Sequence, residues 1–346
     1  MFKNIQAMRA IAAVLVVLYH FAPHFSIAID SSVPTFLFSK WAYFGVDIFF
    51  VISGFVITNS INNKGLTPGF VGNFLSLRLA RIYSGYFPFM LSMLFVYYYT
   101  NPVYLSQISV FNSLLLTSIN QQSLILPVSW SITFELFFYA VLIALFYLSN
   151  RRIVMCLVII TMSLVYNTFL FNRLNILTTP FICEFLYGVI IRLCLYRLIN
   201  VRVKNILAVM PLAIFMMYYA SKMGYGNGIG RVLTFGMAAA YFVSLAVFLE
   251  KKDFIFSNFI VKLGDSSYTI YLSHLIFISL FFSSGLRGWL YNYDLLLSLP
   301  SCVLFIFFII TFSHIYSRLI EIPVYKSLKR IILSKKEYSI GSSAVK

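Results

Sequence analysis

Long apolar stretches, interrupted by short polar segments, repeat along the whole chain. Each stretch is close to the 17–25 residues that a helix needs to cross a bilayer. They are continuous rather than alternating, so a transmembrane barrel is excluded. We predict ten spans: residues 5–25, 41–60, 82–100, 128–148, 153–171, 177–195, 206–220, 232–249, 268–284 and 295–318. The span at 206–220 is the shortest, and the apolar residues 103–119 are predicted to be interfacial or re-entrant.

Basic residues alternate in phase with these spans. If the N-terminus is cytoplasmic, 21 of the 26 Lys and Arg residues fall on the cytoplasmic side. The exceptions are Lys40, Arg173, Lys222, Arg231 and Arg287. This is the positive-inside pattern of a polytopic membrane protein. It predicts an all-α transmembrane bundle with about ten spans and both termini cytoplasmic.

Composition supports the same class. Hydrophobic residues make up 61% of the 346 residues and charged residues only 10%, which excludes a soluble globular enzyme and a disordered chain. The net charge of +16 is explained by the membrane topology rather than by nucleic acid. We predict one membrane domain over residues 1–325 and a short basic cytoplasmic tail over 326–346, suited to an anionic inner leaflet. The four cysteines lie in apolar runs and are interpreted as packing residues.

Polar side chains inside a span are costly, so each one calls for an explanation. Counting about 1.5 Å per residue from the predicted helix ends places His20, Asp47, Glu135 and Glu184 at similar depth in the outer half. A histidine paired with a carboxylate forms a general base, and we expect His20 and Glu135 to act this way. Structural pairing with neighbouring groups is an equal alternative for Asp47 and Glu184.

A second polar group lies at the cytoplasmic side. Arg78 and Arg81 are three residues apart, which puts both guanidinium groups on one helix face, and Arg9 lies at a similar depth. Such a group suits phosphate, although contact with lipid headgroups is the alternative. His274 is counted near the cytoplasmic edge and is interpreted as a packing residue. Four glycines are placed where helices can approach closely: Gly45, Gly54, Gly188 and Gly264.

Seven motifs in order resemble the integral-membrane acyltransferase family 3, which O-acylates cell-surface sugars. The motifs are RAIAAVLVVLYH (9–20), GVDIFFVISGFVIT (45–58), RLARIYSGYFP (78–88), SWSITFELFFY (129–139), EFLYG (184–188), LGDSSYTIYLSH (263–274) and RLIEIP (318–323). Ile132 replaces the leucine that is usual in the fourth motif. The resemblance covers nearly the whole chain.

The resemblance implies an O-acyltransferase, most simply an acetyltransferase, of the bacterial inner membrane. Acyl-CoA is expected as a cytoplasmic co-substrate, with its phosphates at Arg9, Arg78 and Arg81. No bound cofactor and no metal are expected. The acceptor is expected to be a hydroxyl of an extracytoplasmic or lipid-linked sugar, such as O-antigen or exopolysaccharide, with membrane lipids around the protein. Supporting roles in catalysis are expected for four further residues: Asp47, Glu184, Trp130 and Ser131.

Two other functions fit the same charges. A transporter or flippase of a lipid-linked saccharide would use them as a path, but it usually shows inverted repeats, which are not evident here. A structural subunit of an export machine would leave His20 and Glu135 without a purpose. The acceptor sugar, its hydroxyl position, the acyl group and the oligomeric state are not encoded in any motif of this chain. Nor do the motifs distinguish direct transfer from an acyl-histidine intermediate.

Overall fold

The computed structural model describes residues 2–28, 31–61, 67–148, 151–169, 176–283 and 295–343. Within this part of the chain every regular element is a helix. The long helices are α1 (Lys3–Ala28), α2 (Phe44–Ile61), α3 (Pro68–Thr100), α6 (Trp130–Leu148), α7 (Arg152–Phe169), α13 (Met237–Lys251), α15 (Ser267–Ser283), α17 (Leu295–Tyr316) and α18 (Ile322–Ser343). Shorter helices are α4 (Pro102–Leu105), α5 (Val110–Leu115), α8 (Ile182–Leu193), α9 (Leu195–Ile199), α10 (Val203–Ala208), α11 (Met210–Met223), α12 (Gly228–Arg231) and α14 (Asn258–Asp265).

Eight helical segments in this described part are long and apolar enough to span a membrane, and Ser267–Phe282 is a shorter apolar helix. The predicted ends Phe171 and Ser284 lie outside the described residues, as do the basic residues Lys64, Arg173, Arg287 and Lys346. Large apolar side chains such as Leu91, Phe95 and Phe307 are exposed on the outside. A soluble protein rarely exposes so much apolar surface, whereas a bilayer would cover it. The chain is a multi-pass membrane protein.

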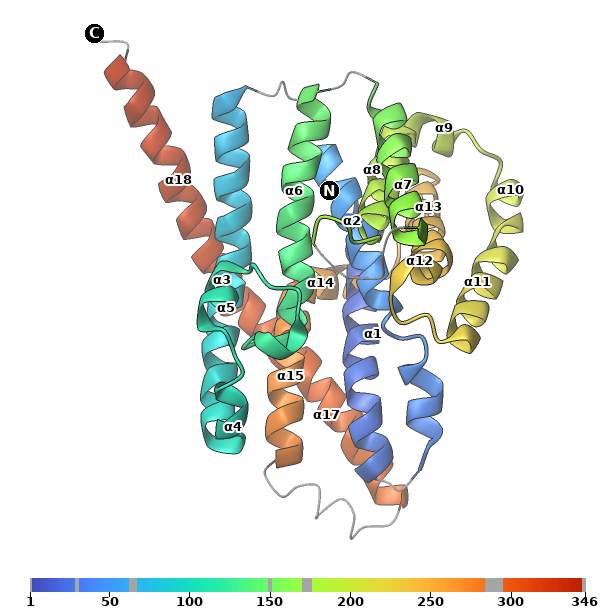
Figure 1. The fold of residues 1–346 in the computed structure, drawn as a ribbon, viewed down its shortest axis with the longest axis vertical. Helices are drawn as coiled ribbons and strands as arrows, with labels where there is room; N and C mark the ends of the chain where they lie inside the picture. Colours follow the sequence, from blue (N-terminus) through green and yellow to red (C-terminus); the bar gives the residue numbers. More distant parts are fainter. Residues whose placement is uncertain are drawn as a thin grey trace.

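Consecutive spans run in opposite directions. In Figure 1, α2 and α6 end at the same end of the molecule at which α3 and α7 begin, whereas α1 ends at the opposite end. This agrees with the alternation that the sequence predicts for these helices. The assignment of one end to the cytoplasm stays a prediction based on the basic residues.

The sixth predicted span differs most from the prediction. Its helix, α8, has only 12 residues, too few to cross a bilayer. Thr179 and Pro180 precede it in irregular backbone, and Thr179 and Phe181 are buried. Irregular backbone at membrane depth is tolerated where protein covers it. The seventh span is interrupted between α10 and α11, yet together they run from Val203 to Met223 and are long enough to cross.

Glycines allow helices to meet at their backbones, as predicted. A Cβ added to Gly54 of α2 would overlap the Phe185 carbonyl of α8, and one added to Gly188 would overlap the Val51 carbonyl. Added Cβ atoms at Gly45 and Gly264 would likewise overlap carbonyl oxygens of α1. The α2–α8 crossing therefore brings two backbones together without side chains between them, and it fixes α2 at the centre of the fold.

Gly188→Ala is expected to destabilise the protein by about 1–3 kcal/mol, because an overpacked core must shift. A lower unfolding temperature of the detergent-solubilised protein would measure this. Gly72→Ala is the matched control: nothing lies within 4 Å of a Cβ added there, so this helical position should be unchanged or stabilised. Equal stability of the two variants would contradict the close crossing.

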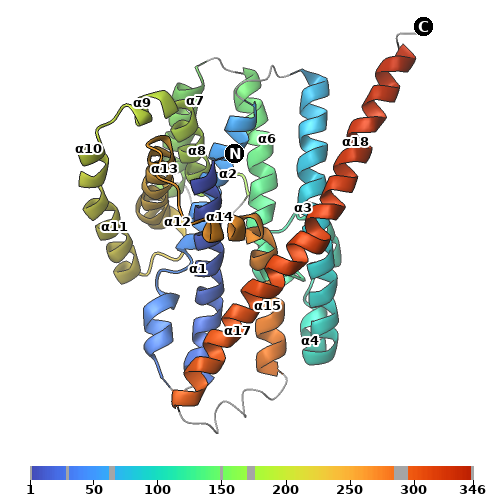
Figure 2. The same cartoon turned by 180° about the vertical axis from the view of Figure 1, so that it is seen from behind.

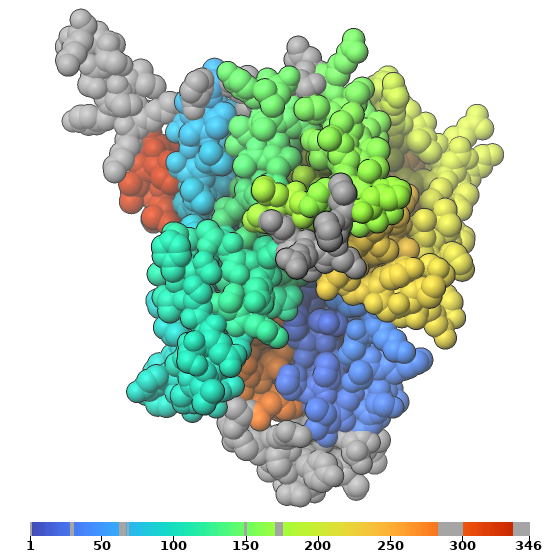
Figure 3. Space-filling view, viewed as in Figure 1, coloured from blue at the N-terminus to red at the C-terminus, as the bar shows by residue number. Residues whose placement is uncertain are grey.

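One long helical rod closes the fold. Figure 2 shows α17 and α18 continuing into one another as a diagonal rod across the bundle. A π-helical turn, η5 (Ser317–Glu321), joins them. Within this turn Glu321 is buried and accepts a hydrogen bond from Thr269 of α15. In Figure 3, α15 is visible as an orange patch between the teal α3–α5 region and the blue α1.

Candidate functional site

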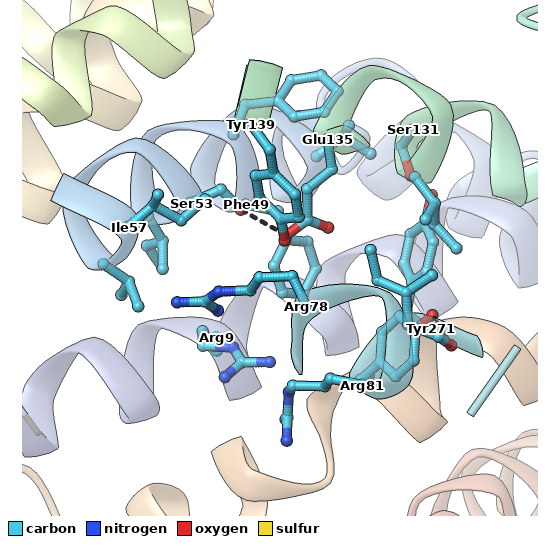
Figure 4. Close-up of a pocket in the computed structure, with 17 residues that line it drawn as sticks. Arg9, Phe49, Ser53, Ile57, Arg78, Arg81, Ser131, Glu135, Tyr139 and Tyr271 are labelled. Atoms are coloured by element: carbon cyan, nitrogen blue, oxygen red, sulfur yellow. Dashed lines mark hydrogen bonds between the residues drawn. The ribbon is translucent and has the colours of Figure 1, made fainter. Parts of the chain in front are cut away.

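A cavity of about 120 Å³ lies among α1, α2, α3, α6 and α15. Its polar lining consists of Arg9, Ser53, Arg78, Arg81, Ser131, Glu135, Tyr139, Tyr268 and Tyr271. Figure 4 shows the three arginines grouped on one side of this cavity and Glu135 with Tyr139 on the other. The five helices thus bring together most of the polar side chains that the sequence singled out.

The arginine group agrees with the sequence prediction. Arg78 donates to Ser60 Oγ at 3.3 Å and lies over the Phe74 ring, whereas Arg9 donates to Gln6 Oε1 at 3.2 Å. Arg81 lies 5.5 Å from the centre of the Tyr325 ring. Among the described residues, the ion pair within 4.0 Å is that of Asp47 with Arg231. None of the three cavity arginines forms an ion pair with a carboxylate in this part of the chain. Three such guanidinium groups suit a multiply charged anion.

Glu135 belongs to this arginine cavity. It accepts hydrogen bonds from Tyr139 and, at 3.4 Å, from Ser53. The structure does not show the predicted contact of Glu135 with His20. The ring of His20 contacts His274 instead. The depth estimate assumed that the fourth span begins at the outer membrane edge. Instead α6 begins about halfway along the molecule (Figure 1), after the short helices that follow α3.

His20 lies beside His274. Nδ1 of His20 is 3.3 Å from Nε2 of His274, and the two ring centres are 5.0 Å apart. His274 is fully buried, whereas His20 is half-buried. The prediction that His274 lies at a different depth from His20 is therefore wrong. The error has the same cause as that for Glu135: helix ends counted from the sequence do not all lie at one membrane surface.

The hydrogen bonds of this pair determine which nitrogen is a base. Nδ1 of His20 faces the Val16 carbonyl at 3.0 Å, and Nδ1 of His274 faces the Ile270 carbonyl at 3.2 Å. Carbonyl oxygens only accept, so both Nδ1 atoms carry a hydrogen when the rings are neutral. The single Nδ1 hydrogen of His20 is then shared between the Val16 carbonyl oxygen and Nε2 of His274, which both accept it. Nε2 of His20 is left unprotonated, with a lone pair that can take a proton or attack a carbonyl carbon.

An aromatic wall, formed by Phe49 and Tyr271, lines the arginine cavity on the side of the histidine pair. Phe49 and Tyr271 line the cavity and contact each other with ring centres 5.8 Å apart. The Tyr271 ring lies 5.9 Å from that of His274, and its hydroxyl bonds to Ser131 Oγ at 2.8 Å and to the Val128 carbonyl. Ser131 thus holds the wall in place. Trp130 packs instead among phenylalanines, 5.7 Å from the Phe181 ring.

Asp47 and Glu184 form a separate buried cluster. Arg231 donates to both Asp47 oxygens, at 3.0 and 2.8 Å, and both side chains are almost fully buried. Glu184 is fully buried and interacts electrostatically with this pair. Of the two interpretations given for Asp47, pairing with a neighbour is therefore observed. The Asp47–Arg231 pair ties α2 to α12, whereas both carboxylate oxygens of Glu184, on α8, are buried without a hydrogen-bond partner among the described residues.

Sequence reasoning missed several residues of these sites, among them Tyr139, Tyr271, Arg231 and His274. Tyr139 follows Glu135 on α6, and Tyr271 precedes His274 on α15. Neither tyrosine stands out in the sequence, because aromatic residues are common in the spans. The topology predicted from the basic residues puts Arg231 in an external loop, and the depth counted for His274 predicts a packing residue. The described residues contain no group of three or more His, Cys, Asp or Glu that could hold a metal ion.

The chain was also compared with known proteins. No curated protein and no solved structure gave a significant match. A family model described as an acyltransferase domain, that of acyltransferase family 3, matches residues 2–323. The match includes α1 to η5 and every residue of the arginine cavity and of the histidine pair. The chain therefore belongs to acyltransferase family 3 and is a membrane acyltransferase.

Proposed function

We propose that this enzyme transfers an acyl group, most simply acetyl, from cytoplasmic acyl-CoA to a hydroxyl of an extracytoplasmic sugar in the bacterial inner membrane. The observation that supports it best is the arrangement along α1. Arg9 lies in the arginine cavity and His20 lies about 16 Å further along the helix axis. An anionic donor held at one end can place its reactive group near a base at the other.

The donor phosphates bind Arg9, Arg78 and Arg81, and the thioester arm extends through the cavity past Phe49 and Tyr271. Nε2 of His20 takes the proton of the sugar hydroxyl while the hydroxyl oxygen attacks the thioester carbon. The carbon–sulfur bond then breaks, and the thiolate of coenzyme A leaves and is protonated. The same lone pair suits an acyl-histidine route, in which His20 attacks first and the sugar second.

His274 orients His20 by accepting its Nδ1 hydrogen, the role that the sequence assigned to Glu135. Glu135 instead neutralises part of the positive charge around the donor. A transporter or flippase, the alternative from the sequence, would use the same charges as a path. Membership of an acyltransferase family favours the transferase.

The acceptor side is tested by mass spectrometry of surface polysaccharide from cells with and without this gene, grown alike. We expect one acyl mass, such as that of acetyl, to be lost from O-antigen or exopolysaccharide when the gene is deleted. Polysaccharide that is exported normally without the acyl group supports the transferase. Polysaccharide that is acylated normally but not exported would support the transporter instead.

Arg78→Ala and Arg81→Ala are each expected to raise the KM for the acyl donor about tenfold or more, because a charge-assisted contact to phosphate is lost. Replacement by Lys should restore only part of it, since lysine lacks the planar guanidinium. Arg197→Ala, which removes an exposed arginine of α9 outside the cavity, is the matched control. A donor KM that is unchanged in both cavity variants would favour lipid contacts.

A further inference from the structure

A second, larger cavity of about 640 Å³ adjoins the first. Both are lined by Arg9, Val56, Arg78 and Arg81, so the three arginines stand where one cavity passes into the other. The outer cavity is also lined by Tyr325, Lys326 and Lys329 of α18. The sequence placed these lysines in a basic tail. In the structure they line the outer cavity instead.

Charge in the outer cavity is strongly one-sided. Five basic side chains line it: Arg9, Arg78, Arg81, Lys326 and Lys329. The acidic residue in its lining, Asp265, accepts a hydrogen bond from Gln6 Nε2 at 2.8 Å. A cavity of this size and charge is suited to a ligand with more than one phosphate group.

Two kinds of cation are arranged in sequence along the path. The three arginines lie at the junction, where planar forks suit a diphosphate whose attached arm enters the inner cavity. The two lysines lie further out and are exposed, as flexible point charges suited to a terminal phosphate. Coenzyme A carries its phosphates in this order: a diphosphate between the pantetheine arm and the adenosine, and a separate phosphate on the ribose.

We propose that the outer cavity binds the nucleotide end of the acyl donor, and that Lys326 and Lys329 recognise the ribose 3′-phosphate of coenzyme A. This rests on the proposed function and adds a specificity site to it. The enzyme then distinguishes acyl-CoA from donors that share the pantetheine arm but lack the ribose phosphate. Anionic lipid headgroups offer the same phosphate chemistry to these lysines, so the test separates the two.

The test measures how tightly coenzyme A and dephospho-coenzyme A bind to the full-length protein in lipid nanodiscs. This binding measurement requires no acceptor. We expect wild-type protein to bind coenzyme A about tenfold more tightly, since each lost phosphate contact weakens binding severalfold. In Lys326→Ala/Lys329→Ala this preference should disappear, with dephospho-coenzyme A binding unchanged. The matched control is Lys204→Ala/Lys262→Ala, which removes two exposed lysines that do not line the cavity and should keep the preference.

The possible outcomes distinguish a failure of the lysine site from a failure of the proposed function. Wild-type protein that binds neither ligand would overturn the proposed donor. Protein that binds both equally, or a double variant that keeps the preference, would overturn the lysine site alone. The measurement is repeated in nanodiscs of neutral lipid and of lipid containing phosphatidylglycerol. If Lys326→Ala/Lys329→Ala loses the preference for coenzyme A only in the anionic lipid, the lysines bind lipid headgroups. Their proposed role in donor recognition is then rejected.

Discussion

His20→Ala is expected to insert and express normally but to lose nearly all acyl transfer. Removing a polar ring from a span does not hinder insertion, because polar groups are what membrane insertion disfavours. General-base assistance is typically worth about 10²–10⁴ in rate, and a covalent route would depend on the ring still more. Acyl transfer from acetyl-CoA to purified polysaccharide in proteoliposomes measures the loss. Near-normal transfer by well-folded His20→Ala protein would remove this mechanism.

Variants of His274 separate orientation from packing. His274→Gln keeps a carbonyl that can accept the Nδ1 hydrogen of His20, whereas His274→Leu fills a similar space without an acceptor. We expect kcat to fall much less in the Gln variant, with the donor KM unchanged in both. If both variants keep full kcat, the histidine contact has no role in positioning.

Arg231→Met is expected to destabilise the protein by about 3–5 kcal/mol, the usual cost of removing one partner of a buried ion pair. The cost is high here because Asp47 is fully buried and the variant leaves its carboxylate without the cation that pairs with it. The unfolding temperature in detergent should fall sharply. Arg197→Ala, at an exposed position, should leave it unchanged.

A double variant tests the cause of this loss. In Asp47→Asn/Arg231→Met the opposing charges are removed together, so we expect part of the stability to return. If the single variant is as stable as wild type, the buried pair is not a structural tie. If the double variant is less stable than Arg231→Met, the loss comes from packing around Arg231 rather than from unpaired charge.

The sequence predicted most of the fold because continuous apolar stretches have few alternatives to membrane helices. It also predicted that Arg78 and Arg81 share one helix face, since residues three apart on a helix need no tertiary information to be neighbours. The glycine crossings were found for a similar reason: a small residue inside a span has a direct effect on how closely helices approach.

Pairing across helices was beyond that reasoning. The depth of His20, Glu135 and His274 was counted from predicted helix ends, on the assumption that every span begins at a membrane surface. Because α6 and α8 begin inside the protein, residues that are counted to one depth lie apart. His274, which lies on α15 and is counted to another depth, lies beside His20. Such re-entrant backbone depends on what covers it, which no local pattern records.

The π-helical turn η5 has a consequence for how the lysines of α18 are aimed. A π turn is equivalent to one residue inserted into an α-helix, and each residue turns the helix by about 100°. Without that extra residue, Lys326 and Lys329 would face another side of the rod while α17 stayed where it is. The direction in which Lys326 and Lys329 point relative to the rest of the bundle thus depends on a register shift of a single residue.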